Sequence, residues 1–131
     1  MEFAVEHRVE KDLTVVKISG EIDVFTSPRL REMLLDIMDG GGTHLVVDLG
    51  EVTFLDSTGL GVLVGVYHRL RARAGSMSFM GVNDRVRRVL HVTQLTKIFV
   101  LHRSLEDAVA AHEAGAGSGP DTRAQGPRAS R

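Results

Sequence analysis

The residues best suited to chemistry form one short run, Asp56-Ser57-Thr58-Gly59-Leu60-Gly61. It follows a nearly continuous apolar stretch of β-favouring residues over 44–49, which is typical of a strand covered on both faces. It precedes a stretch in which apolar residues recur at helical spacing over 60–70. Residues 54–61 are therefore predicted to be a loop that turns into a helix, with Ser57 at the helix start.

Ser57 at a helix start has two interpretations. The first N–H groups of a helix are unpaired and carry partial positive charge, so a serine there can cap the helix or carry an anionic group. Capping is the commoner role, but Asp56 is an equally good cap. Gly59 and Gly61 each cost roughly 1 kcal/mol in a helix relative to alanine. Such glycines permit close approach, either by the sheet or by a partner that reaches Ser57.

The other expected elements alternate between strands and helices, which predicts an α/β sheet of about five mixed, mainly parallel strands with helices mainly on one face. In chain order they begin with antiparallel strands over 3–7 and 13–19, a loop over 20–25, and a helix that Thr26-Ser27-Pro28 opens with a hydroxyl cap and that glycines 40–42 stop. Then follow the helix after Ser57, ended by Gly75, a strand over 77–80, a helix over 86–92 behind Asn83 and Asp84, a strand over 98–101, and a helix opened by Ser104.

The length of 131 residues suits one domain with its own hydrophobic core. From Ala114 the composition changes abruptly to glycine, alanine, proline and arginine, without a large apolar side chain. Such a segment cannot bury enough apolar surface to offset the entropy lost on ordering. We therefore expect a folded domain over 1–113 and a disordered tail over 114–131.

Composition excludes several classes of protein. The chain has no cysteine, which removes disulfides, thiolate zinc sites and a cysteine nucleophile. No histidine pair has metal-binding spacing and no lysine follows a glycine-rich phosphate loop, so we expect neither a metal nor a cofactor. The N-terminus lacks a signal-peptide pattern, and the longest apolar run is far below the roughly 18 residues that span a bilayer. These features predict a cytoplasmic protein without membrane contact.

Nucleic-acid binding is disfavoured as well. The formal net charge is −1 and aromatic residues make up 5% of the chain, whereas nucleic-acid surfaces are usually strongly basic. Arginines cluster at 69–73 and 85–88, and we interpret each cluster as the solvated end of a helix. We therefore expect no direct contact with nucleic acid.

Three motifs together carry a resemblance to a known family. They are Gly20-Glu21-Ile22-Asp23, Asp56-Ser57-Thr58-Gly59-Leu60-Gly61 and Gln94-Leu95-Thr96-Lys97-Ile98-Phe99. With them, the chain resembles the bacterial anti-sigma factor antagonists of the STAS domain family over roughly residues 3–112. The resemblance implies a single STAS-like domain. It also implies that Ser57, in the Asp-Ser-x-Gly motif, is phosphorylated by a partner anti-sigma factor that is a serine kinase.

The resemblance implies a binding switch that controls transcription by exchange of partners, and not an enzyme. The unphosphorylated form binds the anti-sigma factor serine kinase and frees its sigma factor, phosphorylation of Ser57 ends the interaction, and a PP2C-like phosphatase restores it. Asp56, Thr58 and Gly59 are assigned loop geometry and partner contact. Asp23, expected near Ser57, is assigned a hydrogen bond to the partner, although a turn residue bonded to its own backbone is an equal alternative.

Other interpretations stay open beside this one. Thr58 competes with Ser57 as the phosphate acceptor. A STAS-like binding or scaffold module that is not phosphorylated is the alternative function. A hydrolase with Ser57 as nucleophile is disfavoured, because leucine stands where a nucleophile elbow has glycine and no histidine is placed as its base. Gly61 and Gly65 have the spacing of a membrane-helix contact, but we interpret them as close packing on the sheet.

Overall fold

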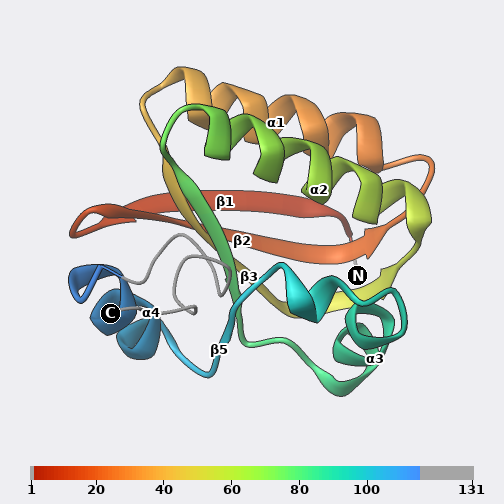
Figure 1. Cartoon of the computed structure of the whole chain (residues 1–131). Helices are drawn as coiled ribbons and strands as arrows, with labels where there is room; N and C mark the ends of the chain where they lie inside the picture. The colour runs from red at the N-terminus through yellow and green to blue at the C-terminus, as the bar shows by residue number, and fades with distance from the viewer. Residues whose placement is uncertain (1, 116–131) are drawn as a thin grey trace.

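A five-stranded mixed sheet forms the centre of the computed structural model, which describes residues 2–115 (Figure 1). The elements are β1 (Ala4–Glu10), β2 (Leu13–Ile22), α1 (Ser27–Asp39), β3 (His44–Leu55), α2 (Ser57–Ala72), β4 (Ser76–Met80), α3 (Asp84–Val92), the 3-10 turn η1 (Leu95–Lys97), β5 (Leu101–His102) and α4 (Leu105–Glu113). The strands lie in chain order, with β1 antiparallel to β2 and all other neighbours parallel. The predicted fold class is confirmed. The expected tail lies outside the described residues from 116 onward.

The sheet separates two layers of helices of unequal size. Helices α1 and α2 lie side by side over one face, and α4 lies on the opposite side (Figure 1). Side-chain alternation along β3 explains this arrangement. Leu45 and Val47 enter the main core under α1 and α2, whereas Val46 packs with Ala108 of α4. Side chains of α3 join the main core, so the prediction of helices mainly on one face is confirmed.

Helices α2, α3 and α4 begin at side-chain caps. Asp56 accepts from the N–H of Thr58, Asn83 from that of Val86 at 2.9 Å, and Ser104 from that of Asp107 at 3.2 Å. Each such cap satisfies an N–H that the helix itself leaves unpaired. These caps agree with the sequence, but the cap predicted for α1 is wrong. The hydroxyl of Thr26 instead donates to the carbonyl of Glu21, outside the helix, at 2.8 Å.

The prediction of a strand over 98–101 is also wrong. Gln94 has a left-handed backbone with φ 63°, and the N–H groups of Ile98 and Phe99 donate to the carbonyl of Leu95. The chain therefore turns helically before β5, which has two residues. Phe99 is 2% exposed and contacts the rings of Tyr67 and Phe79, at centroid distances of 5.0 and 4.7 Å. Its apolar character serves the core and not a strand.

The central strand is longer than expected. Residues 50–55, predicted partly as loop, continue β3 as far as Leu55. Polar residues interrupt the apolar pattern there, yet the backbone of Glu51 still pairs with Ser19 of β2. The connection to α2 is consequently the single residue Asp56. The expected helix end at Gly75 is wrong as well, because α2 ends at Ala72.

Candidate functional site

The loops that follow β2 and β3 meet at one edge of the sheet, because these strands are parallel neighbours. The N–H of Asp56 donates to the carbonyl of Ile22 at 3.3 Å. The hydroxyl of Ser27, the first residue of α1, lies 3.0 Å from the hydroxyl of Thr58. The structure thus brings the β2–α1 loop with Asp23 beside the start of α2 with Ser57, as the sequence predicted.

Asp56 caps α2 through one of its two carboxylate oxygens. Its Oδ1 accepts from the N–H groups of Thr58 at 3.0 Å and Gly59 at 3.2 Å, and from the hydroxyl of Thr58. The hydrogen bond from the Thr58 hydroxyl is the main cause that lowers the pKa of Asp56, opposed by a smaller effect of burial and assisted by the backbone N–H groups. The side chain is therefore a carboxylate at neutral pH, held in one orientation.

Ser57 and Thr58 are neighbours in different surroundings. Thr58 donates its hydroxyl hydrogen to Asp56 and lies within hydrogen-bond reach of Ser27. Ser57 is exposed, and its hydroxyl makes no hydrogen bond to any other residue in the part of the chain that the structure describes. Thr58 is exposed as well, so the two residues differ in the hydrogen bonding of their hydroxyls and not in their exposure. Ser57 stands at the first position of α2, where N–H groups favour an anion.

Gly59 has a structural requirement that Gly61 and Gly65 lack. A Cβ at Gly59 would lie 2.4 Å from Cγ2 of Ile22 and 2.8 Å from Cδ1 of Leu55, so any side chain would push α2 away from the sheet. A Cβ at Gly61 or at Gly65 would meet nothing within 4 Å. The prediction that these two glycines pack on the sheet is wrong. Helix α2 instead turns them outward, where they leave its exposed surface without side chains.

Asp23 makes the hydrogen bonds of a turn residue, which was one of its two predicted roles beside contact with a partner. Its Oδ1 accepts from the N–H of Phe25 at 2.9 Å and of Thr26 at 3.0 Å, and lies 3.2 Å from the hydroxyl oxygen of Thr26. Its own N–H donates to that hydroxyl at 2.9 Å. The Asp23 side chain therefore organises the loop to which it belongs, as aspartate does in turns.

Two apolar side chains at this edge were missed by the sequence reasoning. Phe25 is 87% exposed and Val24 is 58% exposed, both in the loop between β2 and α1. Phe54, near the end of β3, is 45% exposed. The sequence signal for an exposed apolar surface was the adjacent pair Val24 and Phe25 in a predicted loop, where large apolar side chains have no expected place in the core.

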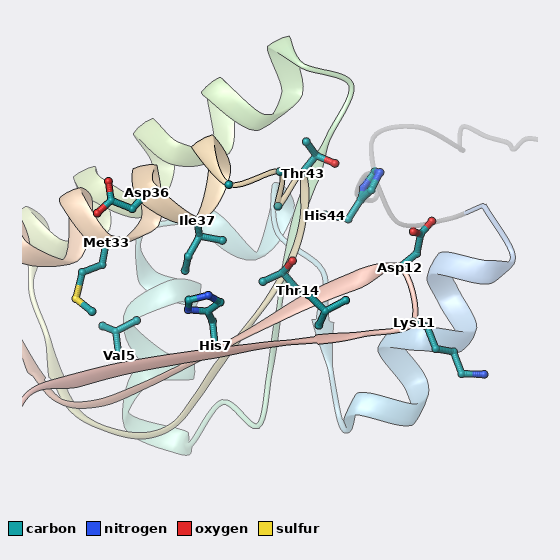
Figure 2. A pocket seen from close by; sticks show the side chains of 14 residues that line it. Val5, His7, Lys11, Asp12, Thr14, Met33, Asp36, Ile37, Thr43 and His44 are labelled. Carbon is teal, nitrogen blue, oxygen red and sulfur yellow. The ribbon is translucent and has the colours of Figure 1, made fainter.

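Two surface hollows lie at different distances from this site. A groove of about 340 Å³ begins at Thr58 and runs between α1 and α2, past Gly61 and Gly65 and the side chains of Arg31 and Arg69. A larger hollow of about 660 Å³ lies at the other end of the sheet, where β2 and β3 begin (Figure 2). Figure 2 shows Val5, His7, Met33 and Ile37 grouped along one part of it, with Asp12 and His44 farther along. The first hollow belongs to the surroundings of Ser57, and the second does not.

Residues 2–115 contain neither a cluster of metal ligands nor a helix suited to a membrane. No group of three or more histidine, aspartate or glutamate side chains there is placed to hold a metal ion. None of the helices in this range has the length and apolar character required to cross a bilayer.

Comparison with known proteins defines the class to which this fold and site belong. A family model described as the STAS domain matches residues 4–108, so the chain belongs to the STAS domain family. A crystal structure of an anti-sigma factor antagonist from Mycobacterium paratuberculosis is 33% identical, with a TM-score of 0.76 over 84% of this chain and 93% of that one. This agreement confirms the resemblance found in the sequence.

Two curated relatives carry a more particular description. An anti-sigma-B factor antagonist from Staphylococcus aureus is 32% identical over 106 residues, which cover 81% of this chain and 98% of that protein. The anti-sigma-B factor antagonist from Listeria monocytogenes is 41% identical over 81 residues, which cover 62% of this chain and 71% of that protein. Within the STAS family, the chain therefore groups with the anti-sigma factor antagonists.

Proposed function

We propose that this anti-sigma factor antagonist is a switch controlled by phosphorylation of Ser57. The unphosphorylated form binds an anti-sigma factor that is a serine kinase, and the bound sigma factor is released. The kinase then transfers the γ-phosphoryl group of ATP to Oγ of Ser57, with loss of the hydroxyl proton and formation of ADP, and the complex dissociates. A PP2C-like phosphatase hydrolyses the phosphoserine. The chain acts in the cytoplasm as ligand and substrate, without a cofactor of its own.

The observation that carries this proposal is the contrast between the two hydroxyls at the start of α2. Both residues are exposed, but the Thr58 hydroxyl is engaged by Asp56 and Ser27, whereas the Ser57 hydroxyl makes no hydrogen bond within the described residues. A kinase can reach Ser57 without breaking a contact that holds the fold. Capping of α2 does not depend on Ser57 either, because Asp56 supplies the cap.

Electrostatics explains how a phosphate can end binding without unfolding the domain. A phosphoserine adds about −1.5 to −2 charges at pH 7, and the N-terminus of α2 compensates part of that charge. The Asp56 carboxylate is adjacent, so the surface that a partner meets becomes strongly negative. Like charges placed together at an interface cost several kcal/mol, and each 1.4 kcal/mol is a tenfold change in affinity.

The test is phosphorylation by purified anti-sigma factor kinases from the source organism, one at a time, with Mg-ATP. Intact-mass and fragment mass spectrometry should find one phosphate, on Ser57. The Ser57→Ala variant should receive none, and the Thr58→Val variant should still be phosphorylated on Ser57. Binding to such a kinase without phosphate transfer would overturn the switch and favour a binding module that is not phosphorylated. Phosphate on Thr58 would overturn the choice of acceptor.

A further inference from the structure

The β2–α1 loop exposes more apolar surface than its position in the fold requires. Five large apolar side chains are exposed in the part of the chain that the structure describes, and two of them, Val24 and Phe25, are adjacent in this loop. Phe25 is the most exposed of the five, at 87%. An exposed phenylalanine contributes nothing to the core, and clustered apolar surface beside polar groups marks a site of protein contact.

The loop that carries Phe25 is held in place before any partner arrives. The N–H of Phe25 donates to Oδ1 of Asp23, and the N–H of Thr26 donates to the same oxygen. The Thr26 hydroxyl donates to the carbonyl of Glu21 at 2.8 Å, which attaches the loop to the end of β2. A loop whose backbone is fixed in this way loses less entropy on binding than an unrestrained loop.

The same loop is joined to the residues around Ser57. Ser27 lies 3.0 Å from Thr58 through their hydroxyls, and Asp56 donates its N–H to Ile22. Ile22 in turn packs so closely against Gly59 that no side chain fits between them. The loop and the start of α2 therefore form one continuous surface, and a protein that reaches Ser57 also meets Val24 and Phe25.

We infer that Phe25, supported by Val24, is the apolar anchor that inserts into the partner protein which binds at Ser57, and that Asp23 acts by positioning this anchor. The inference rests on the proposed function. The partner has an apolar pocket beside the residues that receive the Ser57 hydroxyl. Aromatic side chains at the centre of an interface often carry most of its binding energy. Because Phe25 is uncharged and belongs to the neighbouring loop, its apolar contact contributes to affinity in a way that phosphorylation does not directly alter.

The experiment measures dissociation constants by calorimetry for the unphosphorylated chain and the anti-sigma factor kinase that phosphorylates it, in the presence of ADP. Phe25→Ala should weaken binding by about tenfold or more, the range of interface hot spots. Val9→Ala is the matched control, because Val9 is 73% exposed on β1 and away from this surface. It should bind within about twofold of the wild type. Thermal unfolding should be the same for all three chains, since both side chains are exposed.

The role of Asp23 is separated by two substitutions. Asp23→Asn keeps an oxygen that accepts from Phe25 and Thr26 and should retain binding, whereas Asp23→Ala removes it and should weaken binding by about threefold to tenfold. In the Phe25→Ala background, Asp23→Ala should add little, because the anchor it positions is gone. Equal losses for the asparagine and alanine variants would overturn the positioning role and show that the partner contacts the Asp23 charge.

The outcomes distinguish the two proposals. Wild-type binding with an unchanged affinity for Phe25→Ala would overturn the anchor and leave the proposed function standing. If the wild-type chain binds none of the kinase-type anti-sigma factors, the proposed function is wrong, and the inference that Phe25 is an anchor is wrong as well.

Discussion

The two ends of the sheet use polar side chains in opposite ways. Where β2 and β3 end, Asp23 and Asp56 accept hydrogen bonds from the backbone of their own loops. Where these strands begin, side chains from separate elements contact one another instead. His112 of α4 lies 3.8 Å from the Asp12 carboxylate, and its ring is 4.7 Å from that of His44.

This difference separates the surface proposed for the partner from one where polar contacts link separate elements of the fold. Short-range hydrogen bonds fix the loops around Ser57 and leave Ser57 and Phe25 exposed. At the other end the polar groups fasten α4 to the β1–β2 hairpin, since Lys11 and Glu113 also approach to 3.8 Å. Substitutions of the exposed residues Ser57 and Phe25 should therefore change binding and not stability, whereas substitutions in the contacts at the second end should change stability.

The largest effect should come from a negative charge at Ser57. We expect Ser57→Asp to weaken binding to the anti-sigma factor kinase on the order of a hundredfold, through like-charge repulsion at the interface. Its circular-dichroism spectrum and urea midpoint should match the wild type, because the side chain is exposed at a helix N-terminus that favours an anion. Ser57→Ala, which stays neutral, is the binding control. A loss of structure in Ser57→Asp would contradict the separation of binding from stability at this end.

Gly59 lies at the first end but is packed against the sheet, so its substitution should change stability. Gly59→Ala should lower the free energy of unfolding by about 1–3 kcal/mol, because the added Cβ collides with Ile22 and Leu55. The matched control is Gly61→Ala, which meets nothing within 4 Å and should raise stability by up to about 1 kcal/mol through helix propensity. Urea unfolding measures both. Similar stabilities for the two variants would show that the start of α2 can move away from β2.

Removing the cap of α2 should have a smaller effect on stability. Asp56→Ala leaves the N–H groups of Thr58 and Gly59 without their acceptor and should cost about 1 kcal/mol of unfolding free energy. Asp56→Asn can still accept these bonds and should lose much less. If the two substitutions are equally destabilising in urea, the carboxylate charge matters more than the cap geometry.

The smallest effect should be a pH dependence at the opposite end. Burial, with a further contribution from His112, lowers the pKa of His44 below 6.5, and Asp12 offsets part of this. The unfolded chain then binds the proton more readily, so the free energy of unfolding should decrease as the pH falls through about 6.5. The loss should be a few tenths of a kcal/mol, because the group is only partly buried.

His44→Gln tests this pH dependence, measured as the difference in unfolding free energy between pH 7.5 and pH 5.5. The decrease on acidification should be smaller in this variant than in the wild type. His68→Gln is the control, because it removes a histidine that is exposed on α2 and lies on a different element. An unchanged pH dependence in His44→Gln would leave another group responsible, such as His102, whose pKa is also lowered by burial.

Local sequence was sufficient where a residue acts on its own neighbours. The caps at Asn83 and Ser104, and the start of α2 at Ser57, follow from side chains within three residues of the N–H groups they serve. The order of strands and helices follows from the period of apolar residues, which reports the face that each element buries. The proximity of Asp23 to Ser57 came from the family resemblance, and parallel pairing of β2 with β3 accounts for it.

Tertiary structure decided the features that depend on distant residues. Gly59 and Gly61 are two positions apart in α2 and look alike in sequence, yet only Gly59 faces Ile22 of β2. Phe99 has the character of a strand residue, but contacts with Tyr67 and Phe79 place it in the core on a helical turn. The contact of His44 with His112 joins the start of β3 to the last helix. Local pattern specifies which surfaces are apolar or capped, whereas packing of elements far apart in the chain selects what each residue touches.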